Sequence, residues 1–223
     1  MAVTVTDVLK ANLVLVGVEL LRGEEQFKVF RTIVDTEVTI APGPGLLIGA
    51  PSDIPLPGHI LSLNRDRIVL ELSPSRSTIN RDYPSKEGWD RLAKVAWHAI
   101  ATSDLTDQQL RAYGYNIELV YEQNSGLPAL RYLGERLFQS ALFSDIGWES
   151  MGGSGKLNFM DDEERWQVLI EPRLNDAETT KIFLSLNLHK QEQTLPTEEN
   201  IQDSLKKIEE QAQRFINLLD KSV

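Results

Sequence analysis

The chain has 223 residues, of which 33 are acidic and 23 are basic, so its formal net charge is −10. This charge repels phosphate backbones and anionic lipid surfaces at long range, which argues against binding to nucleic acids or membranes. The sequence contains no cysteine, which excludes disulfides, thiolate metal sites and cysteine nucleophiles.

The first part of the chain is predicted to consist mainly of strands. Segment 3–10 fits either a strand or a loose arm, and 24–34 fits a helix, although dense β-branched residues near its end are also compatible with a strand. Strands are expected at 12–21, 37–40 and 46–48, and a hairpin is expected from 59–63 and 67–72 around Asn64-Arg-Asp66.

A long amphipathic helix is predicted after Pro84. Ser85 can accept hydrogen bonds from free N–H groups of the first turn. The apolar positions that follow have helical spacing and define one wide face, namely Trp89, Leu92, Ala93, Ala96, Trp97 and Ile100. Segment 103–114, with a short helix expected after Thr106, is the candidate boundary between two halves.

The second half repeats this kind of order. Strands are expected at 115–121, 156–160, 166–170 and 181–189, with helices at 128–143 and from Ile201 to Leu219. The last strand alternates and places four apolar side chains on one face, namely Ile182, Leu184, Leu186 and Leu188. Its helix follows Pro196-Thr197, as the earlier one follows Pro84-Ser85.

These patterns predict an α+β fold with an internal duplication. Each half reads as a strand, a helix, a group of antiparallel strands and a long helix, with the helices packed on one face of antiparallel sheet. The first repeat is predicted to cover residues 1–104 and the second 105–223, and the two are expected to pack together as one globular unit.

The glycine-rich stretch Gly152-Gly-Ser-Gly-Lys156 is a candidate anion site. A Walker loop is excluded, because Ser150 stands where its first glycine is required, Leu157 follows the lysine and a strand is expected next. A loop between strands is therefore favoured, while Gly153, Gly155 and Lys156 stay the candidate residues for a less specific phosphate contact through backbone N–H groups.

No metal site is predicted. Asp161-Asp-Glu-Glu164 lacks the spaced ligands of a calcium loop, so a solvated turn is favoured. The three histidines, His59, His98 and His189, are scattered and do not have zinc-ligand spacing. No cofactor fingerprint is present, and we expect no cofactor.

Two groups of residues are candidates for partner binding. Arg76 and Arg81, with Arg65 and Arg67, concentrate positive charge that fits either an anionic partner or local salt bridges. The last helix carries a heptad-like seam, namely Ile201, Leu205, Ile208, Ala212, Phe215 and Leu219. Packing of this seam on the chain's own sheet is favoured over a partner contact.

The leading functional hypothesis is a non-catalytic protein-binding module, such as an adaptor, a chaperone-like protein, an inhibitor or an immunity-type protein. It would act through a groove or the C-terminal helix, on another protein or by self-association. The alternative is a nucleotide- or small-molecule-binding enzyme that uses Gly152–Lys156 and the arginines, and a third hypothesis is nucleic-acid binding through Arg65–Arg81. No secretory signal is visible, so we expect a cytoplasmic protein without membrane contact.

Overall fold

The computed structural model describes residues 4–17, 39–40, 59–64, 67–72, 86–102, 105–137, 153–161, 164–173 and 179–221. The strands are β1 (Thr4–Gly17), β2 (Thr39–Ile40), β3 (His59–Asn64), β4 (Arg67–Leu72), β5 (Leu110–Glu122), β6 (Gly155–Asp161), β7 (Glu164–Pro172) and β8 (Lys181–Lys190). The helices are α2 (Lys86–Thr102), the short 3-10 helix η1 (Asp107–Gln109), α3 (Ala129–Leu137) and α5 (Glu198–Lys221).

The described strands form one sheet in the order β2-β3-β4-β1-β5-β8-β7-β6. Every neighbouring pair is antiparallel except β2 and β3, which run parallel over two residues. The long strands β1 and β5 pair at the centre, from Thr4 opposite Glu122 to Gly17 opposite Leu110. The described helices accompany a largely antiparallel sheet and do not alternate with parallel strands, so the fold is α+β.

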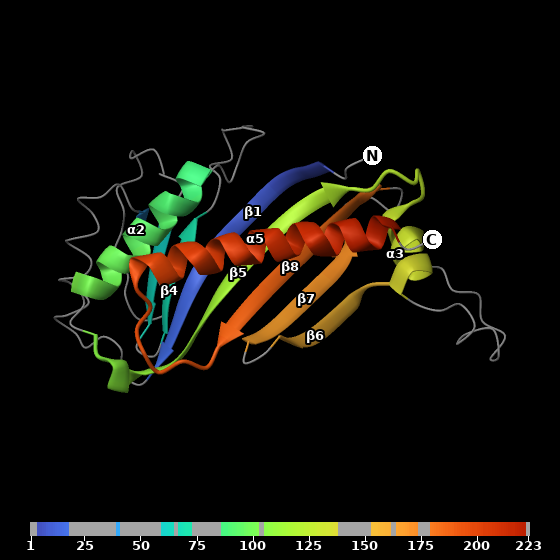
Figure 1. Ribbon diagram of the computed structural model, residues 1–223. Helices are drawn as coiled ribbons and strands as arrows, with labels where there is room; N and C mark the ends of the chain where they lie inside the picture. Colours follow the sequence, from blue (N-terminus) through green and yellow to red (C-terminus); the bar gives the residue numbers. More distant parts are fainter. Residues whose placement is uncertain are drawn as a thin grey trace.

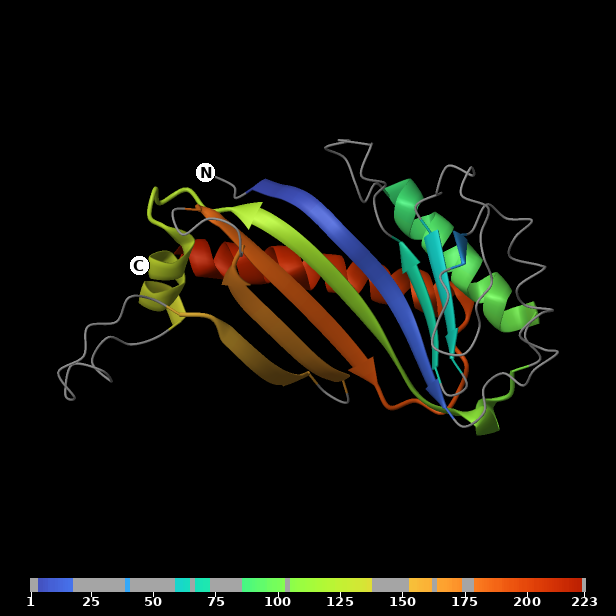
Figure 2. The same cartoon turned by 180° about the vertical axis from the view of Figure 1, so that it is seen from behind.

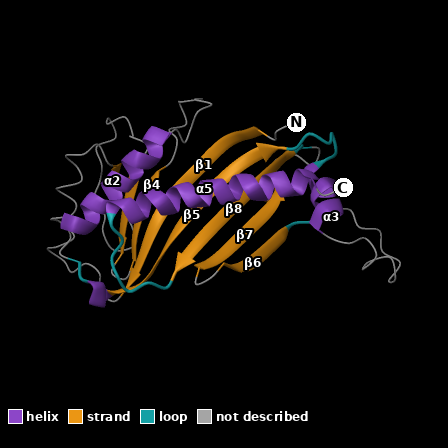
Figure 3. Ribbon diagram, viewed as in Figure 1, coloured by secondary structure: helices purple, strands orange, loops and turns teal. Residues whose placement is uncertain are grey.

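Helices α2 and α5 lie over the same face of the sheet. Figure 1 shows α5 crossing in front of the strands, and the reverse view in Figure 2 shows it behind them. Helix α5 contacts β5, β8 and α2, while α2 also contacts β4. Figure 3 shows these two helices as one layer against the sheet, with α3 beyond one end. None of the described helices combines the length and apolar content needed to cross a membrane.

The core lies between α5 and this covered face of the sheet. Alternate residues of β5 and β8 point into it because side chains on a strand alternate between faces. Helix α5 contributes buried residues at three- and four-residue intervals, namely Ile201, Leu205, Ile208, Ala212, Ile216 and Leu219. The sheet contributes Leu13, Leu15, Tyr115, Ile117, Leu119, Val168, Ile170, Ile182, Leu184, Leu186 and Leu188.

Several predicted elements are confirmed. The hairpin around Asn64-Arg-Asp66, the hairpin after β6 and the alternation of β8 are all present. Helix α5 begins after a reciprocal cap, in which the Asn200 N–H donates to Thr197 Oγ1 and the Thr197 N–H donates to Asn200 Oδ1, both at 3.2 Å. The expectations for 24–34 and 46–48 lie outside the described residues.

Two predictions about elements need correction. The strand expected to begin at residue 12 begins at Thr4, because its pairing with β5 continues through the ambiguous segment by means of two register shifts. The prediction of one wide buried face on α2 is wrong for Trp97, which is 41% exposed. The buried stripe of α2 is narrower and rich in alanine, which allows the close approach to α5.

Candidate functional site

The face of the sheet opposite the helices carries a row of amide side chains, one on each of five adjacent strands. They stand directly opposite one another in register, in the order Asn12 (β1), Asn116 (β5), Asn187 (β8), Gln167 (β7) and Asn158 (β6). Directly opposite residues of paired strands share a face, so these five side chains form one line across the sheet. We call this line the amide row, and we call this side of the sheet, over which none of the described helices lies, the open face.

Hydrogen bonds join most neighbours in the row. The Asn116 amide N–H donates to Asn12 Oδ1 at 2.5 Å, and the Asn187 amide N–H donates to Asn116 Oδ1. On the outer strands, Gln167 Nε2 donates to Asn158 Oδ1 at 3.1 Å. Each primary amide carries two N–H donors and an oxygen with two acceptor sites, so the row has further capacity for hydrogen bonding.

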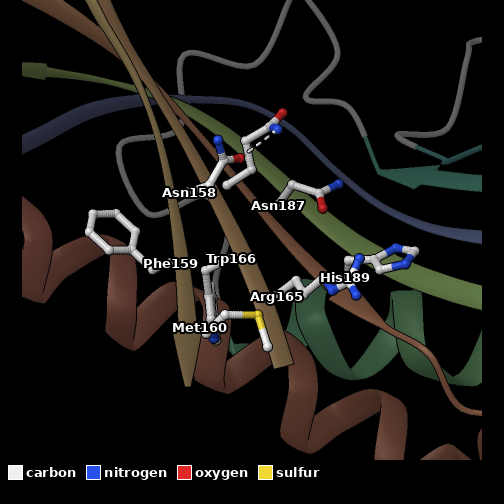
Figure 4. A pocket seen from close by; sticks show the side chains of 8 residues that line it. Asn158, Phe159, Met160, Arg165, Trp166, Asn187 and His189 are labelled. Carbon is white, nitrogen blue, oxygen red and sulfur yellow. Dashed lines mark hydrogen bonds between the residues drawn. The ribbon is translucent and has the colours of Figure 1, made fainter. Parts of the chain in front are cut away.

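Exposure increases along the row from the centre of the sheet to its edge. Asn12 is buried, the middle three residues are half-buried and Asn158 is exposed. The exposed end borders a hollow of about 480 Å³ on β6, β7 and β8. Its lining consists of Asn158, Phe159, Met160, Arg165, Trp166, Gln167, Asn187 and His189. In Figure 4, Asn158 and Asn187 lie toward one end of the hollow and Arg165 and His189 toward the other, and β7 separates the strands that carry the two asparagines.

A second cross-strand row supplies the charged side of the hollow. Met160 stands opposite Arg165, and Arg165 stands opposite His189. The next position in this row is Gly114 on β5, where a Cβ atom would lie only 3.0 Å from the Leu188 carbonyl oxygen. The hollow thus combines neutral amides with one permanent cation, Arg165, and a thioether.

Strand β6 forms the rim of the hollow and one edge of the described sheet. Its side chains Phe159 and Met160 are 47% and 65% exposed. Large exposed apolar side chains beside a hollow are typical of interaction surfaces rather than of a solvated strand. The residues that line the hollow do not include a nucleophile beside a general base.

Glu164, the last residue of the acidic stretch, has a structural role, so the interpretation of this stretch as a solvated turn needs correction at that residue; Asp161 is exposed, and residues 162–163 lie outside the described residues. Glu164 is mostly buried and lies 2.6 Å from Lys207 Nζ on α5 and 3.4 Å from Lys190 Nζ on β8. Lys207 Nζ also lies 5.9 Å from the centre of the Trp166 ring. These contacts fix α5 to the sheet. Among the described residues there is no group of three or more His, Asp or Glu side chains suited to a metal ion.

The described part of the glycine-rich stretch is used for packing. The Gly153 N–H donates to the Leu130 carbonyl at 3.2 Å. Gly155 begins β6, and a Cβ atom there would lie 3.3 Å from Leu137 Cδ1 at the end of α3. The glycine therefore allows α3 to approach the sheet closely, and Lys156 is an exposed strand residue.

The predicted partner-binding residues of α5 do not line the hollow. Ile201, Leu205, Ile208 and Leu219 are buried against the chain's own sheet, and Phe215 packs against the same core. They are therefore not presented to another protein while α5 is in place. Arg76 and Arg81 lie outside the described residues.

Four tyrosines lie in the core beneath α5. The Tyr113 hydroxyl donates to Glu192 Oε2 and the Tyr132 hydroxyl donates to Asp220 Oδ1, both at 2.7 Å. Burial raises the pKa of Tyr113, Tyr115, Tyr121 and Tyr132 above the ordinary value, and for Tyr113 and Tyr132 the bonded carboxylate raises it further. No described residue bonds to the buried Tyr121 hydroxyl.

Sequence reasoning missed the amide row because its members are far apart in the chain. Each one occupies an unremarkable polar position in an alternating strand, and only the order and register of the strands bring them together. The usable signal was the recurrence of an amide in the middle of several predicted strands. Comparisons with protein-family models, with curated proteins and with solved structures found no match.

Proposed function

We propose that the protein is a non-catalytic protein-binding module that binds an extended polypeptide segment on the open face of its sheet. The amide row carries this proposal. A polypeptide main chain offers alternating N–H donors and C=O acceptors, and a line of side-chain amides offers the matching groups without a net charge. The adjoining hollow, with Met160 and Arg165, provides space for side chains of the bound segment.

The exposed half of the amide row, formed by Asn187, Gln167 and Asn158, is the part suited to binding. It lies on three neighbouring strands, and the backbone of these strands is held rigidly by continuous pairing. A rigid surface loses little conformational entropy when a partner binds, which favours affinity. The alternative of a nucleotide-binding enzyme has less support, since Gly153 and Gly155 are both in contact with α3.

We also infer that the fold is an internal duplication. From the centre of the sheet outward, the first half runs β1, β4, β3, β2 and the second half runs β5, β8, β7, β6. Each half begins at the centre, moves to the edge and ends in a long helix. Among the described strands the two halves differ in one pairing: β2 runs parallel to its neighbour β3, whereas β6 runs antiparallel to its neighbour β7. Two such halves side by side make the open face broad enough for an extended chain.

A matched pair of glutamine variants tests the proposed function. Gln167 and Gln213 are both half-buried, and each donates to an asparagine side chain, at 3.1 and 3.2 Å. Gln167 lies in the amide row, whereas Gln213 lies on α5. Peptides selected from a displayed random library on the immobilised full chain provide the probes, and their affinities are measured by fluorescence anisotropy.

Gln167→Met is expected to weaken the selected peptides roughly three- to tenfold, as loss of one hydrogen bond predicts, while Gln213→Met leaves affinity unchanged. Amide NMR shifts on peptide addition should map to β6, β7 and β8. If the library yields no binder, or if both variants bind the selected peptides as tightly as the original chain, the proposal is wrong.

A further inference from the structure

We infer that two copies of the chain pair antiparallel through β6, with the two Asn158 residues facing each other at a two-fold axis, so that the amide row continues from one copy into the other. This inference rests on the proposed use of the open face and names one protein partner, a second copy. It also gives the hollow an outer wall that a single copy lacks.

The outer edge of β6 is suited to strand pairing. Among the described strands, β6 pairs only with β7, and it does so over seven consecutive residue pairs without a register shift. Free edges are usually protected by proline, bulges or clustered charges. Strand β6 has no proline and carries one lysine, Lys156, and one aspartate, Asp161. The edge is therefore regular and locally neutral in a chain whose net charge is −10.

The sequence of β6 matches itself in one antiparallel register. An axis at Asn158 places Leu157 opposite Phe159 of the second copy, and Lys156 opposite Met160, whose thioether can pack on the lysine methylenes. An axis at Phe159 instead places Leu157 opposite Asp161 and Asn158 opposite Met160, which opposes polar and apolar groups. The axis at Phe159 also pairs the two Phe159 side chains with each other, but only the axis at Asn158 pairs Phe159 with Leu157 and the two Asn158 amides with each other.

The hydrogen bonding of Asn158 supports the same register. Its Oδ1 accepts from Gln167 within the chain, and within the described residues nothing accepts from its Nδ2. Two facing asparagines at the axis can each donate from Nδ2 to the other's Oδ1, which retains a second acceptor site. The row of five amides in each copy then becomes one line of ten across two sheets.

Two substitutions with the same charge change test this register. Asn158→Asp keeps the acceptor for Gln167 but places two carboxylates opposite each other at the axis. Met160→Glu adds the same charge two residues away, opposite Lys156 of the second copy. In sedimentation velocity at about 0.15 M salt, where surface charges are screened within ~8 Å, the unaltered chain and Met160→Glu should sediment as dimers. Asn158→Asp should raise the dimer dissociation constant by about tenfold or more.

Single-cysteine variants provide an independent measurement, since the chain contains no cysteine. Under mild oxidation, Asn158→Cys should form a disulfide-linked dimer, because directly opposite residues lie within disulfide reach. Met160→Cys is at the more exposed position but should stay unlinked, because the two Met160 positions are offset by about 13 Å along the strands. Circular dichroism confirms that each variant is folded.

Three results would overturn the inference: a monomer at all concentrations, equal dissociation by Asn158→Asp and Met160→Glu, or equal crosslinking of both cysteine variants. The dimer and the proposed peptide binding can fail independently, and the measurements distinguish the two cases. Selected peptides that bind the unaltered chain while it sediments as a monomer, and that still depend on Gln167, would support peptide binding without the dimer. A dimer with the expected crosslink in a chain that selects no peptide would support the reverse.

Discussion

Tyr121 and Tyr132 place the same side chain in the same core, but with different hydrogen bonding. The Tyr132 hydroxyl donates to Asp220 at 2.7 Å and so links α3 to the end of α5. The buried Tyr121 hydroxyl has no partner among the described residues. An unpartnered buried polar group loses its water contacts without compensation, which destabilises the folded state.

Substituting phenylalanine at each position should therefore change stability in opposite directions. Tyr121→Phe should raise the free energy of unfolding by about 1 kcal/mol, and Tyr132→Phe should lower it by about 1–2 kcal/mol, because only the second removes a bond to a charged acceptor. Urea denaturation with unchanged slopes measures both effects. Equal destabilisation by the two substitutions would show that Tyr121 has an unrecognised partner.

Strand β5 concentrates three of the buried tyrosines, Tyr113, Tyr115 and Tyr121, on its covered face, with Tyr132 packed nearby on α3. Their folded-state pKa values are raised above the unfolded value. The associated stability is thus fully present below the unfolded pKa, about 10, and is lost as the pH rises above it. Above this pH, tyrosine hydroxyls in the unfolded chain release their protons, while the buried hydroxyls of the folded chain keep theirs.

The free energy of unfolding should fall by up to roughly 5.5 kcal/mol per pH unit above about pH 10, which is ~1.4 kcal/mol for each of the four tyrosines. Urea unfolding at about pH 9 and about pH 11 measures the loss. Tyr121→Phe should reduce the slope by about a quarter, which separates the tyrosine contribution from lysine deprotonation. Titration of all tyrosines near pH 10, observed by absorbance with the fold intact, would contradict this expectation.

At the scale of elements, local sequence patterns predicted whether a segment is a helix or a strand better than they predicted where it begins and ends. The alternation from Ile182 to Leu188 and the turn at Asn64-Arg-Asp66 depend on a few consecutive residues, and both were readable. The extension of β1 back to Thr4 was not, because that segment gains its strand form by pairing with β5, more than 100 residues away. Trp97 is exposed for a similar reason, since the packing of α2 against α5 decides which part of its apolar face is buried.

The candidate site was beyond sequence reasoning for a related physical cause. The proposed surface depends on which strands are neighbours and on their register, and neither property is encoded within a single strand. The glycine-rich stretch drew attention because its pattern is local, yet Gly155 serves the packing of Leu137. The seam of α5 was recognised as apolar, and its packing on the chain's own sheet was favoured over a partner contact, which agrees with the burial of Ile201, Leu205 and Ile208.

At the scale of the whole molecule, the proposed duplication divides the sheet between β1 and β5. Residues 105–223 contain β5, β6, β7 and β8 with α3 and α5, and they supply most of the described buried side chains. This half has its own strands and its own covering helix, so it should fold without residues 1–104. If residues 105–223 fold without the rest of the chain, the edge of β5 that normally pairs with β1 is left unpaired.

The isolated half should form a dimer in which the free edge of β5 pairs with β5 of a second copy. In a duplicated fold, β5 holds the same position in its half as β1 holds in the other half, so a second β5 can take the place of β1. With Asn158→Asp, which disrupts the inferred β6 contact, we expect residues 105–223 to show cooperative urea unfolding and to elute as a dimer in size-exclusion chromatography with light scattering. Without that substitution both sheet edges can pair, so assemblies larger than a dimer are expected. An unfolded fragment, or a folded fragment that stays monomeric, would argue that the halves are not equivalent and that β1 has a role β5 cannot replace.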